Sequence, residues 1–383
     1  MPGLLPDVDP DGLLEYSVVF TDRSLNSMSK SFQQVMNDIH RTLCEVYKAD
    51  SAVVVPGGGT FGMEAVARQF ASDEKCLVVR NGWFSFRWSQ ICDAGNIPKE
   101  LTVMRARQYG NEDHSPFSPP PIDEVVARIA DEQPAVVFAP HVETSAGMML
   151  SDDYIKQLAD AAHDAGGIFV LDCIASGCMW VDMAALGVDV LISAPQKGWS
   201  ASPAAGLVML SSRAVERMEG TSSSSFAVDL KKWHQIMQAY LNGGHAYHAT
   251  MPTDALRTFR DTMQETEEFG FDAIRDAQVE LGGKIRQVLE SRGFKSVAAD
   301  GFKAPGVVVS FTEDPALQNG SKFMAEGLQI AAGVPLEVGE RASFKTFRIG
   351  LFGNDKLKSV DQTVAKFADA LDRVLEADTR QVA

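Results

Sequence analysis

The sequence lacks any long run of apolar residues. None of its apolar segments approaches the roughly 20 residues that a helix needs to cross a bilayer. Its first residues, MPGLLPDVDPDG, also lack the basic and then apolar layout of a secretory signal peptide. We therefore expect no membrane association and a cytoplasmic location.

Cysteine is sparse, and its spacing is not that of a metal site. The five cysteines are scattered without a CxxC pair, and no HExxH motif accompanies the histidines. An odd number of scattered cysteines favours reduced and mostly buried thiols over a disulfide framework. We therefore predict no metal centre. The cysteines are Cys44, Cys76, Cys92, Cys173 and Cys178.

Positive charge is also in short supply. The chain has 35 basic residues against 51 acidic ones, and its formal net charge is −16. Long-range electrostatics of this sign oppose binding to nucleic acid or to anionic lipid. Any anionic ligand must therefore be held by local groups.

The sequence does contain short apolar runs that alternate with helical stretches. Runs that are apolar on both faces are typical of a mostly parallel sheet covered by helices. Such runs occupy residues 52–55, 76–79, 135–139, 168–172, 189–193 and 206–210. The length of 383 residues exceeds what one hydrophobic core usually organises, which indicates a large domain and a smaller one.

The remaining segments predict helices and a second unit. Apolar residues recur at three- and four-residue steps over residues 32–46, which predicts an amphipathic helix before the first strand. The stretch 252–294 is rich in helix formers and predicts one long connecting helix. Apolar runs at 306–311 and 347–352, followed by an amphipathic stretch over 360–374, predict a smaller α+β unit.

A glycine-rich segment, residues 56–64, follows the first predicted strand and opens a helix. The free amides and the dipole of a helix N-terminus suit a phosphate, and glycine lets the backbone approach the anion closely. The segment also matches GxGxxG through Gly57, Gly59 and Gly62, so dinucleotide binding is an alternative, and a plain tight turn is another. An NAD site would place an acidic residue after the second strand, where this chain has Arg80, a possible partner for the 2′-phosphate of NADP.

Two ionisable residues follow later strands. Asp172 ends the apolar run at 168–171, where a buried carboxylate needs a cationic partner such as a protonated pyridine nitrogen. Lys197 follows the next strand in the segment SAPQKGW, and a lysine in such a loop can form a Schiff base. Each residue has a plainer alternative, since a strand-end Asp often caps a helix and most lysines are exposed.

An arginine lies within an apolar strand of the smaller unit. Arg348 presents a planar fork that fits a carboxylate through two parallel hydrogen bonds, although a structural ion pair is the alternative. The order of a phosphate loop, a strand-end Asp, a loop lysine and a strand arginine is more specific than any one of them.

This ordered set resembles the class V aminotransferases of pyridoxal 5′-phosphate (PLP) fold type I, in particular the alanine–glyoxylate and serine–pyruvate branch. The resemblance implies an α/β fold in which a mostly parallel sheet of the seven-stranded type lies between helices, with a smaller C-terminal α+β domain. We expect an N-terminal arm in residues 1–22, a large PLP-binding domain in 23–252, and the connecting helix and small domain in 253–383. The motifs that carry the resemblance are SMSKSF (27–32), GGGTFGMEA (57–65), NGWFSFR (81–87), HVETSAG (141–147), LDCIAS (171–176), SAPQKG (193–198), YHATMP (247–252) and FRIGLFG (347–353).

The resemblance also implies roles for individual residues. Lys197 would form the Schiff base with PLP and later move a proton between substrate and cofactor, and Asp172 would keep the pyridine nitrogen protonated. Phe84 falls where the family usually stacks a tryptophan on the ring, so stacking survives while the larger indole area is lost. The other implied cofactor contacts are Gly58, Gly59, Thr60, Thr144, Ile174, Gln196, Tyr247 and Thr250.

The resemblance further implies a homodimer with shared active sites. Tyr247 and Thr250 match phosphate ligands that the family draws from the second subunit. Leu25 and Asn26 fall where the family places a partner loop over the substrate, and they depart from the glycine, or histidine and arginine, common there. Arg348 would hold the substrate α-carboxylate. The implied reaction is a ping-pong transfer from a small L-amino acid, such as serine or alanine, to glyoxylate or pyruvate.

Other activities of the same fold remain open. A PLP-dependent lyase or cysteine desulfurase would need a mobile nucleophilic cysteine, whereas Cys173 and Cys178 lie in and after the end of the strand that carries Asp172. Transaminases for aspartate, ureidoglycine, an aminophosphonate or an aminosulfonate would share the same machinery. A non-catalytic PLP-fold protein would not need Asp172, Lys197 and Arg348 together.

One further segment departs from the family pattern. Residues 334–340, VPLEVGE, replace an expected glycine-rich stretch. Glu337 and Glu340 would disfavour dicarboxylate donors if they faced the substrate, and a surface loop is the plainer interpretation.

Overall fold

The computed structural model describes residues 8–9 and 12–381, so part of the expected N-terminal arm, residues 1–7 and 10–11, lies outside the described residues. A central sheet has the strand order β1-β11-β10-β9-β6-β2-β3. Strand β11 is antiparallel to both of its neighbours and the other pairs are parallel, which confirms the mostly parallel sheet. Its strands are β1 (Ser51–Pro56), β2 (Lys75–Arg80), β3 (Glu100–Arg105), β6 (Val136–Pro140), β9 (Ile168–Asp172), β10 (Val190–Ser193) and β11 (Ala205–Leu210).

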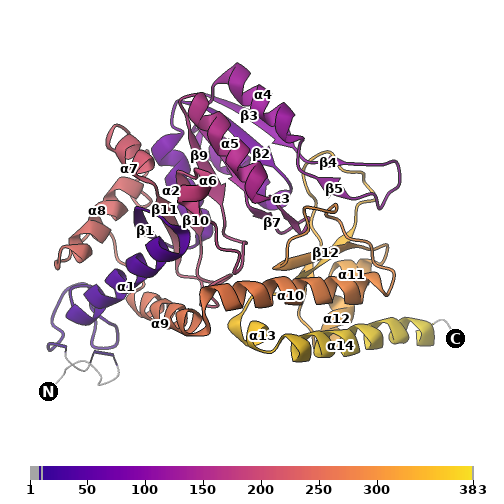
Figure 1. The fold of residues 1–383 in the computed structure, drawn as a ribbon. Helices are drawn as coiled ribbons and strands as arrows, with labels where there is room; N and C mark the ends of the chain where they lie inside the picture. Colours follow the sequence, from indigo (N-terminus) through magenta and orange to yellow (C-terminus); the bar gives the residue numbers. More distant parts are fainter. Residues whose placement is uncertain (1–7, 10–11, 382–383) are drawn as a thin grey trace.

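Helices cover both faces of this sheet (Figure 1). The expected amphipathic helix is α1, which begins after Ser29, whose side chain accepts a hydrogen bond from the Phe32 amide. Two short ribbons, β4 (Arg107–Gln108) with β5 (Phe117–Ser118) and β7 (Val142–Glu143) with β8 (Met148–Met149), flank the sheet. The helices are α1 (Lys30–Tyr47), α2 (Gly59–Phe70), α3 (Trp83–Gly95), α4 (Ile122–Glu132), α5 (Asp152–Asp164), α6 (Met183–Leu186), α7 (Ser212–Glu219) and α8 (Leu230–Leu241).

The expected single connecting helix is two helices. Helix α9 (Thr253–Phe269) and helix α10 (Phe271–Glu290) are separated at Gly270, whose φ of 94° is outside the helical range. Helix α9 packs its apolar side chains into the core of the large sheet, and α10 packs into the second core. The break therefore lies where the chain passes from one core to the other.

The smaller C-terminal unit is built on an antiparallel sheet of order β12-β14-β13, with α10 and α14 running alongside each other (Figure 1). This confirms the predicted α+β character. No helix in the described part of the chain is long and apolar enough to cross a membrane. The elements are β12 (Val307–Phe311), α11 (Pro315–Gln318), α12 (Ser321–Ala325), β13 (Ala331–Ala332), β14 (Thr346–Gly350), α13 (Asn354–Lys358) and α14 (Val360–Gln381).

The topology brings several polar segments to one edge of the large sheet. Strands β1, β9 and β10 end at this edge, because β1 and β10 both pair antiparallel with β11 while β9 and β10 are parallel. Ligands of open α/β sheets bind at such carboxyl ends. The glycine-rich start of α2, Asp172 and the Lys197 loop follow these strands and so converge.

Helix α2 lies directly against strand β11 through two glycines. A Cβ added at Gly206 would lie 2.7 Å from the backbone N and Cα of Gly62. Real Cβ atoms do not approach backbone this closely, so the helix would have to move. The pair thus sets the position of the α2 N-terminus over the sheet.

We expect Gly206→Ala to lower the free energy of unfolding by about 1–3 kcal/mol, because the added methyl group overpacks the helix–sheet contact. The measurement is the urea midpoint followed by circular dichroism. Gly220→Ala is a matched control, since Gly220 has a φ of −85° and an added Cβ would meet nothing closer than 3.7 Å. Equal midpoints for the two variants would contradict the role given to this contact.

Candidate active site

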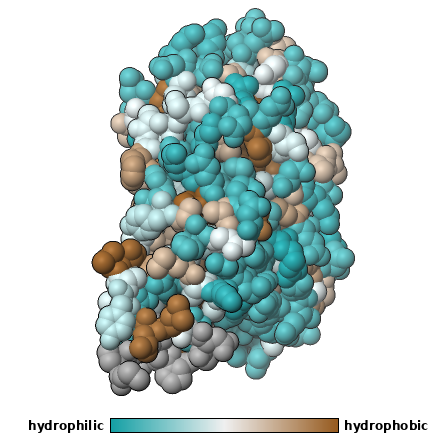
Figure 2. Space-filling view, turned by 90° about the vertical axis from the view of Figure 1, so that its left-hand side faces the viewer, coloured by the Kyte–Doolittle hydropathy of each residue, from teal (hydrophilic) through white to brown (hydrophobic). Residues whose placement is uncertain are grey.

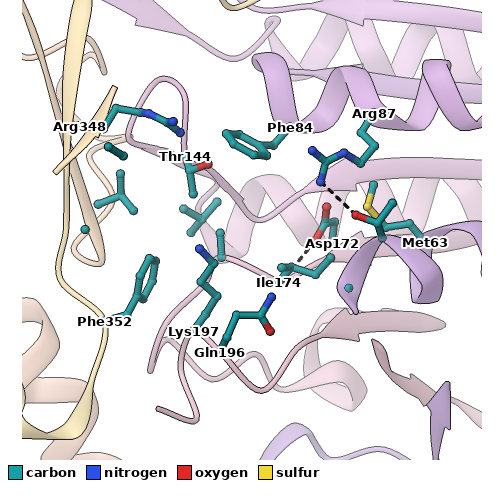
Figure 3. Close-up of a pocket in the computed structure, with 17 residues that line it drawn as sticks. Met63, Phe84, Arg87, Thr144, Asp172, Ile174, Gln196, Lys197, Arg348 and Phe352 are labelled. Carbon is teal, nitrogen blue, oxygen red and sulfur yellow. Dashed lines mark hydrogen bonds between the residues drawn. The ribbon is translucent and has the colours of Figure 1, made fainter. Parts of the chain in front are cut away.

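A cavity of about 380 Å³ opens where the large sheet faces strand β14 of the smaller unit (Figure 3). It brings together most of the residues that the sequence singled out. The predicted residues that line it are Gly59, Thr60, Phe84, Thr144, Asp172, Ile174, Gln196, Lys197 and Arg348. The other residues that line it are Met63, Arg87, Val142, Ala175, Val307, Ala331, Gly350 and Phe352.

Asp172 lies at the end of β9 and is 8% exposed. Its Oδ1 accepts a hydrogen bond of 2.9 Å from the Ile174 amide, and no residue of the described chain forms an ion pair with it. Burial raises the pKa of this carboxyl to about 7, with the Ile174 hydrogen bond acting in the opposite direction. The carboxylate is therefore poised to take a cationic partner from a ligand.

Lys197 extends from the loop after β10 into the same cavity (Figure 3). Its Nζ lies 5.1 Å from the centre of the Phe352 ring. Burial lowers the pKa of Lys197, and the charge of Arg348 lowers it further. A lower pKa increases the fraction of neutral amine, which is the form that attacks a carbonyl.

The start of helix α2 forms a cradle for an anion. Gly58 is the N-cap in extended conformation, and the amides of Gly59 and Thr60, in the first turn, have no intrahelical acceptor. A Cβ at Gly59 would come within 2.6 Å of Cδ1 of Ile174, so the Ile174 side chain would have to shift to admit a larger residue. The buried Oε1 of Gln196 has no hydrogen-bond partner among the described residues, and its carboxamide can rotate to donate to an anion.

Phe84 and Ile174 lie on opposite sides of the cavity, with Thr144 between Phe84 and Lys197 (Figure 3). Phe84 is the second residue of α3. An aromatic face and an aliphatic side chain on opposite sides suit a flat aromatic ring.

The cavity fits PLP in three respects. The buried Asp172 carboxylate lacks a cation that a protonated pyridine nitrogen would supply, the α2 cradle suits its phosphate, and Lys197 suits its aldehyde. Bound there, PLP would provide an electron sink for negative charge at a substrate carbon. The roles of the individual residues toward PLP remain predictions.

Arg348 enters the cavity from β14. Its Nε donates to the Ala332 carbonyl at 2.8 Å, and its Cζ lies 5.4 Å from the centre of the Phe84 ring. Burial lowers the pKa of the guanidinium, which has no ion-pair partner within residues 12–376. The alternative of a structural ion pair is thus not observed among the described residues, and the guanidinium is available to an anionic ligand.

Five predicted residues are not among those that line this cavity: Gly58, which is the N-cap of α2, and four others. Leu25 is fully buried in its own chain, and Asn26 donates from Nδ2 to Glu15 at 2.7 Å. Tyr247 and Thr250 are exposed and lie 3.2 Å apart through their hydroxyl oxygens. One chain alone therefore does not test their expected roles in a partner's site.

Glu143 is a residue that the sequence analysis did not single out. It is fully buried, and its two oxygens accept from the amides of Phe84, Ser85 and Ser145 at 3.2, 2.9 and 3.1 Å. The hydroxyls of Ser85 and Ser145 each donate to it at 2.7 Å. A Cβ at Gly82 would lie 2.2 Å from Oγ of Ser145. Glu143 therefore fixes the start of α3 and, with it, the position of Phe84.

Arg87 also lines the cavity and was named only as part of a motif. It lies three residues after Phe84 on α3, and residues at this spacing share a helix face. The helical spacing of Phe84 and Arg87 is the sequence signal that could have identified Arg87. Glu143 had no such signal, because its hydrogen-bond partners Phe84 and Ser85 lie far from it in the sequence.

This geometry gives no support to the alternatives of a nucleophilic cysteine, a dinucleotide site at Arg80 or a substrate-facing Glu340. Burial raises the pKa of Cys178 to about 12 and raises that of Cys173 well above its usual value, which disfavours a nucleophilic thiolate. Arg80 donates to Ser89 and to the Glu337 carbonyl rather than lining the cavity. Glu340 accepts hydrogen bonds from the amides of its own loop, as expected of a surface turn. Among the described residues no cluster of metal-binding side chains occurs.

The raised pKa of Asp172 predicts a pH dependence for the ligand-free protein. Between about pH 4 and about pH 7 the folded chain retains a proton that the unfolded chain has released, so this contribution to stability is lost as pH rises. We expect Asp172→Asn, which cannot titrate, to lose less stability than the parent between about pH 5 and about pH 8 in urea unfolding. Asp369→Asn, at an exposed position, serves as control; equal losses in all three proteins would refute the assignment.

The chain is similar to known proteins of one family. The family model for class V aminotransferases matches residues 13–345. The 2-aminoethylphosphonate–pyruvate transaminase of Syntrophobacter fumaroxidans is 25% identical over 353 residues, covering 90% of each chain. Alanine–glyoxylate aminotransferase 1 of Saccharomyces cerevisiae is 24% identical over 351 residues, covering 86% of each.

Solved structures show the same fold. The ureidoglycine–glyoxylate aminotransferase of Bacillus subtilis superposes with a TM-score of 0.76 at 19% identity, over 91% of this chain and 86% of that one. Since the family model covers most of the sequence, this protein belongs to the class V aminotransferases and is a PLP-dependent transaminase.

Proposed function

We propose that this transaminase takes the amino group of a small L-amino acid, such as alanine or serine, and passes it to glyoxylate or pyruvate by a ping-pong mechanism. The observation that carries the proposal is the guanidinium of Arg348, which faces the cavity beside Lys197 without an ion-pair partner among the described residues. A planar fork in this position fits the α-carboxylate that these amino acids and 2-oxo acids share.

The surroundings of Arg348 favour a small substrate. The other lining residues contributed by the smaller unit are Val307, Ala331, Gly350 and Phe352, which are apolar. They provide no second cation for the distal acid of a dicarboxylate. This favours substrates with one acid group and a short side chain.

Each of the following residues would have its own role in the reaction. Arg348 holds the carboxylate and orients the α-carbon toward Lys197. The amine of Lys197, whose pKa is lowered by burial, would accept the proton from that carbon and deliver it to the carbon of PLP that bears the aldehyde. Asp172 holds the positive charge of the ring nitrogen, while Phe84 and Ile174 keep water from the two faces.

An aminophosphonate donor is the second candidate. The relative from Syntrophobacter fumaroxidans is named for 2-aminoethylphosphonate and pyruvate. In this donor the carbon that carries the amine has no carboxylate, and the anionic group lies one carbon further away. Arg348 would still be needed for the carboxylate of pyruvate, so the two candidates differ in the donor half-reaction alone.

We also propose a homodimer with shared active sites. Tyr247 is 64% exposed and the neighbouring Thr250 is exposed, although the resemblance gives both a role at a phosphate. The N-terminal segment carries exposed Leu13, Tyr16 and Val18. Figure 2 shows hydrophobic side chains gathered beside the grey N-terminal atoms. A second copy covering this face would bury the apolar side chains.

The donor test follows the visible absorption of the PLP-loaded protein while L-alanine, L-serine, L-aspartate and 2-aminoethylphosphonate are added singly. We expect alanine or serine to convert the cofactor to its amino form, and glyoxylate or pyruvate to restore it. Arg348→Gln should raise the KM for these donors by about tenfold or more, because a charged hydrogen-bond pair is lost. Conversion by 2-aminoethylphosphonate alone would replace the proposed donor with the second candidate.

The shared-site proposal is tested by mixing two inactive variants. Lys197→Ala removes the reacting amine, and Tyr247→Ala removes the residue expected to cross into the partner's site. We expect activity to return when the two are unfolded and refolded together, because a mixed dimer contains one site with both residues intact. A tag on one variant shows whether mixed dimers have formed. If they have formed and activity does not return, Tyr247 does not contribute to the partner's site.

A further inference from the structure

Arg87 is a cation in the active-site cavity to which no role has been assigned. It lies on α3 and is half-buried, and its Nη1 donates to Oγ1 of Thr60 at 3.1 Å. Its Cζ lies 5.4 Å from the centre of the Phe84 ring. Figure 3 shows it on the side of the cavity away from Arg348. In the described chain it forms no ion pair, and most of its five donors are unused.

This position is electrostatically unfavourable without an anion. Thr60 belongs to the first turn of α2, so the Arg87 guanidinium is held beside the positive end of the helix dipole. A cation there is repelled, and in a chain with net charge −16 many acidic partners were available elsewhere. Arg87 is close enough to Asp172 to lower the pKa of that carboxyl, yet the two do not pair. The positive charge of Arg87 and the negative charge of Asp172 are thus both available to a ligand that carries a negative and a positive group.

The charge of a phosphate exceeds what the helix provides. A phosphate monoester carries about −1.5 to −2 at pH 7, whereas a helix N-terminus contributes about +0.5. Backbone amides alone therefore leave most of the charge unbalanced in a half-buried site. A guanidinium that already contacts the first turn supplies the missing positive charge and further donors.

We propose that Arg87 binds the phosphate group of PLP within its own chain, beside the first turn of α2. The proposal deepens the cofactor site and rests on PLP being the cofactor, not on the identity of the amino donor. The ring nitrogen meets Asp172 and the phosphate meets Arg87, so the cavity matches the two charges of the cofactor at its two ends.

One turn of α3 would then position both the ring and the phosphate of the cofactor. Phe84 and Arg87 share a face of α3, and Glu143 fixes the start of that helix through hydrogen bonds to its amides. The ring-stacking side chain and the phosphate-binding side chain are therefore held in one rigid frame, whereas Tyr247 and Thr250 depend on a second subunit.

The test compares PLP with pyridoxal, which has the same ring and aldehyde but no phosphate. Each is titrated into cofactor-free protein, and Kd is obtained from absorbance and tryptophan fluorescence without any turnover. We expect Arg87→Gln to weaken PLP binding by about tenfold or more and pyridoxal binding by less than about twofold, as a charged hydrogen-bond partner is lost. Arg87→Met, which keeps the aliphatic stem, should behave alike and replaces the first variant if that one does not fold.

Arg128→Gln provides the matched control, because Arg128 lies exposed on α4 outside the cavity, and it should change neither Kd. An equal loss for both compounds would mean that Arg87 acts through the ring, and no loss for either would mean that it does not bind the cofactor. Both outcomes overturn the proposal. Since no donor enters the experiment, failure of the proposed donor would leave this result unchanged.

Discussion

The site depends on one constraint, which is that a carboxylate buried without a cation is unstable. Asp172 ends an apolar strand, and within its own chain it receives a single hydrogen bond, from the Ile174 amide. The pKa of Asp172 is raised because burial disfavours its charged form. A ligand that brings a positive charge to this point would relieve that isolation, as we propose for the protonated pyridine ring of PLP.

Two buried carboxylates in this active site show how the fold separates structure from chemistry. Glu143 receives five hydrogen bonds from Phe84, Ser85 and Ser145, so its charge is satisfied within the chain and fixes a helix. Asp172 is left nearly bare for a ligand. The hydrogen bonds to Glu143 make this part of the chain rigid, and they hold Phe84 in the cavity that Asp172 also lines.

The cationic side chains of the cavity come from different parts of the chain. Arg348 faces the cavity from the smaller unit and Arg87 from the large one, and each has its Cζ 5.4 Å from the centre of the Phe84 ring. Lys197 extends from the loop after β10, and its pKa is lowered in part by Arg348. Under the two proposals, Arg348 would hold the substrate carboxylate and Arg87 the cofactor phosphate, with the Lys197 amine nearer to Arg348 in its electrostatic influence.

The sequence by itself determined six of the seven strands of the large sheet and most of the cavity, while strand β3 was not predicted. Uniformly apolar strands can only be buried, and the residues that follow β1, β9 and β10 must then meet at one edge, which placed Thr60, Asp172 and Lys197 together. Tertiary structure decided the rest: the break at Gly270 and the clamp of Glu143 on α3. A period-based pattern cannot show where one core gives way to another, and a hydrogen bond between segments 58 or 59 residues apart leaves no local signal, because it exists only once both segments are packed.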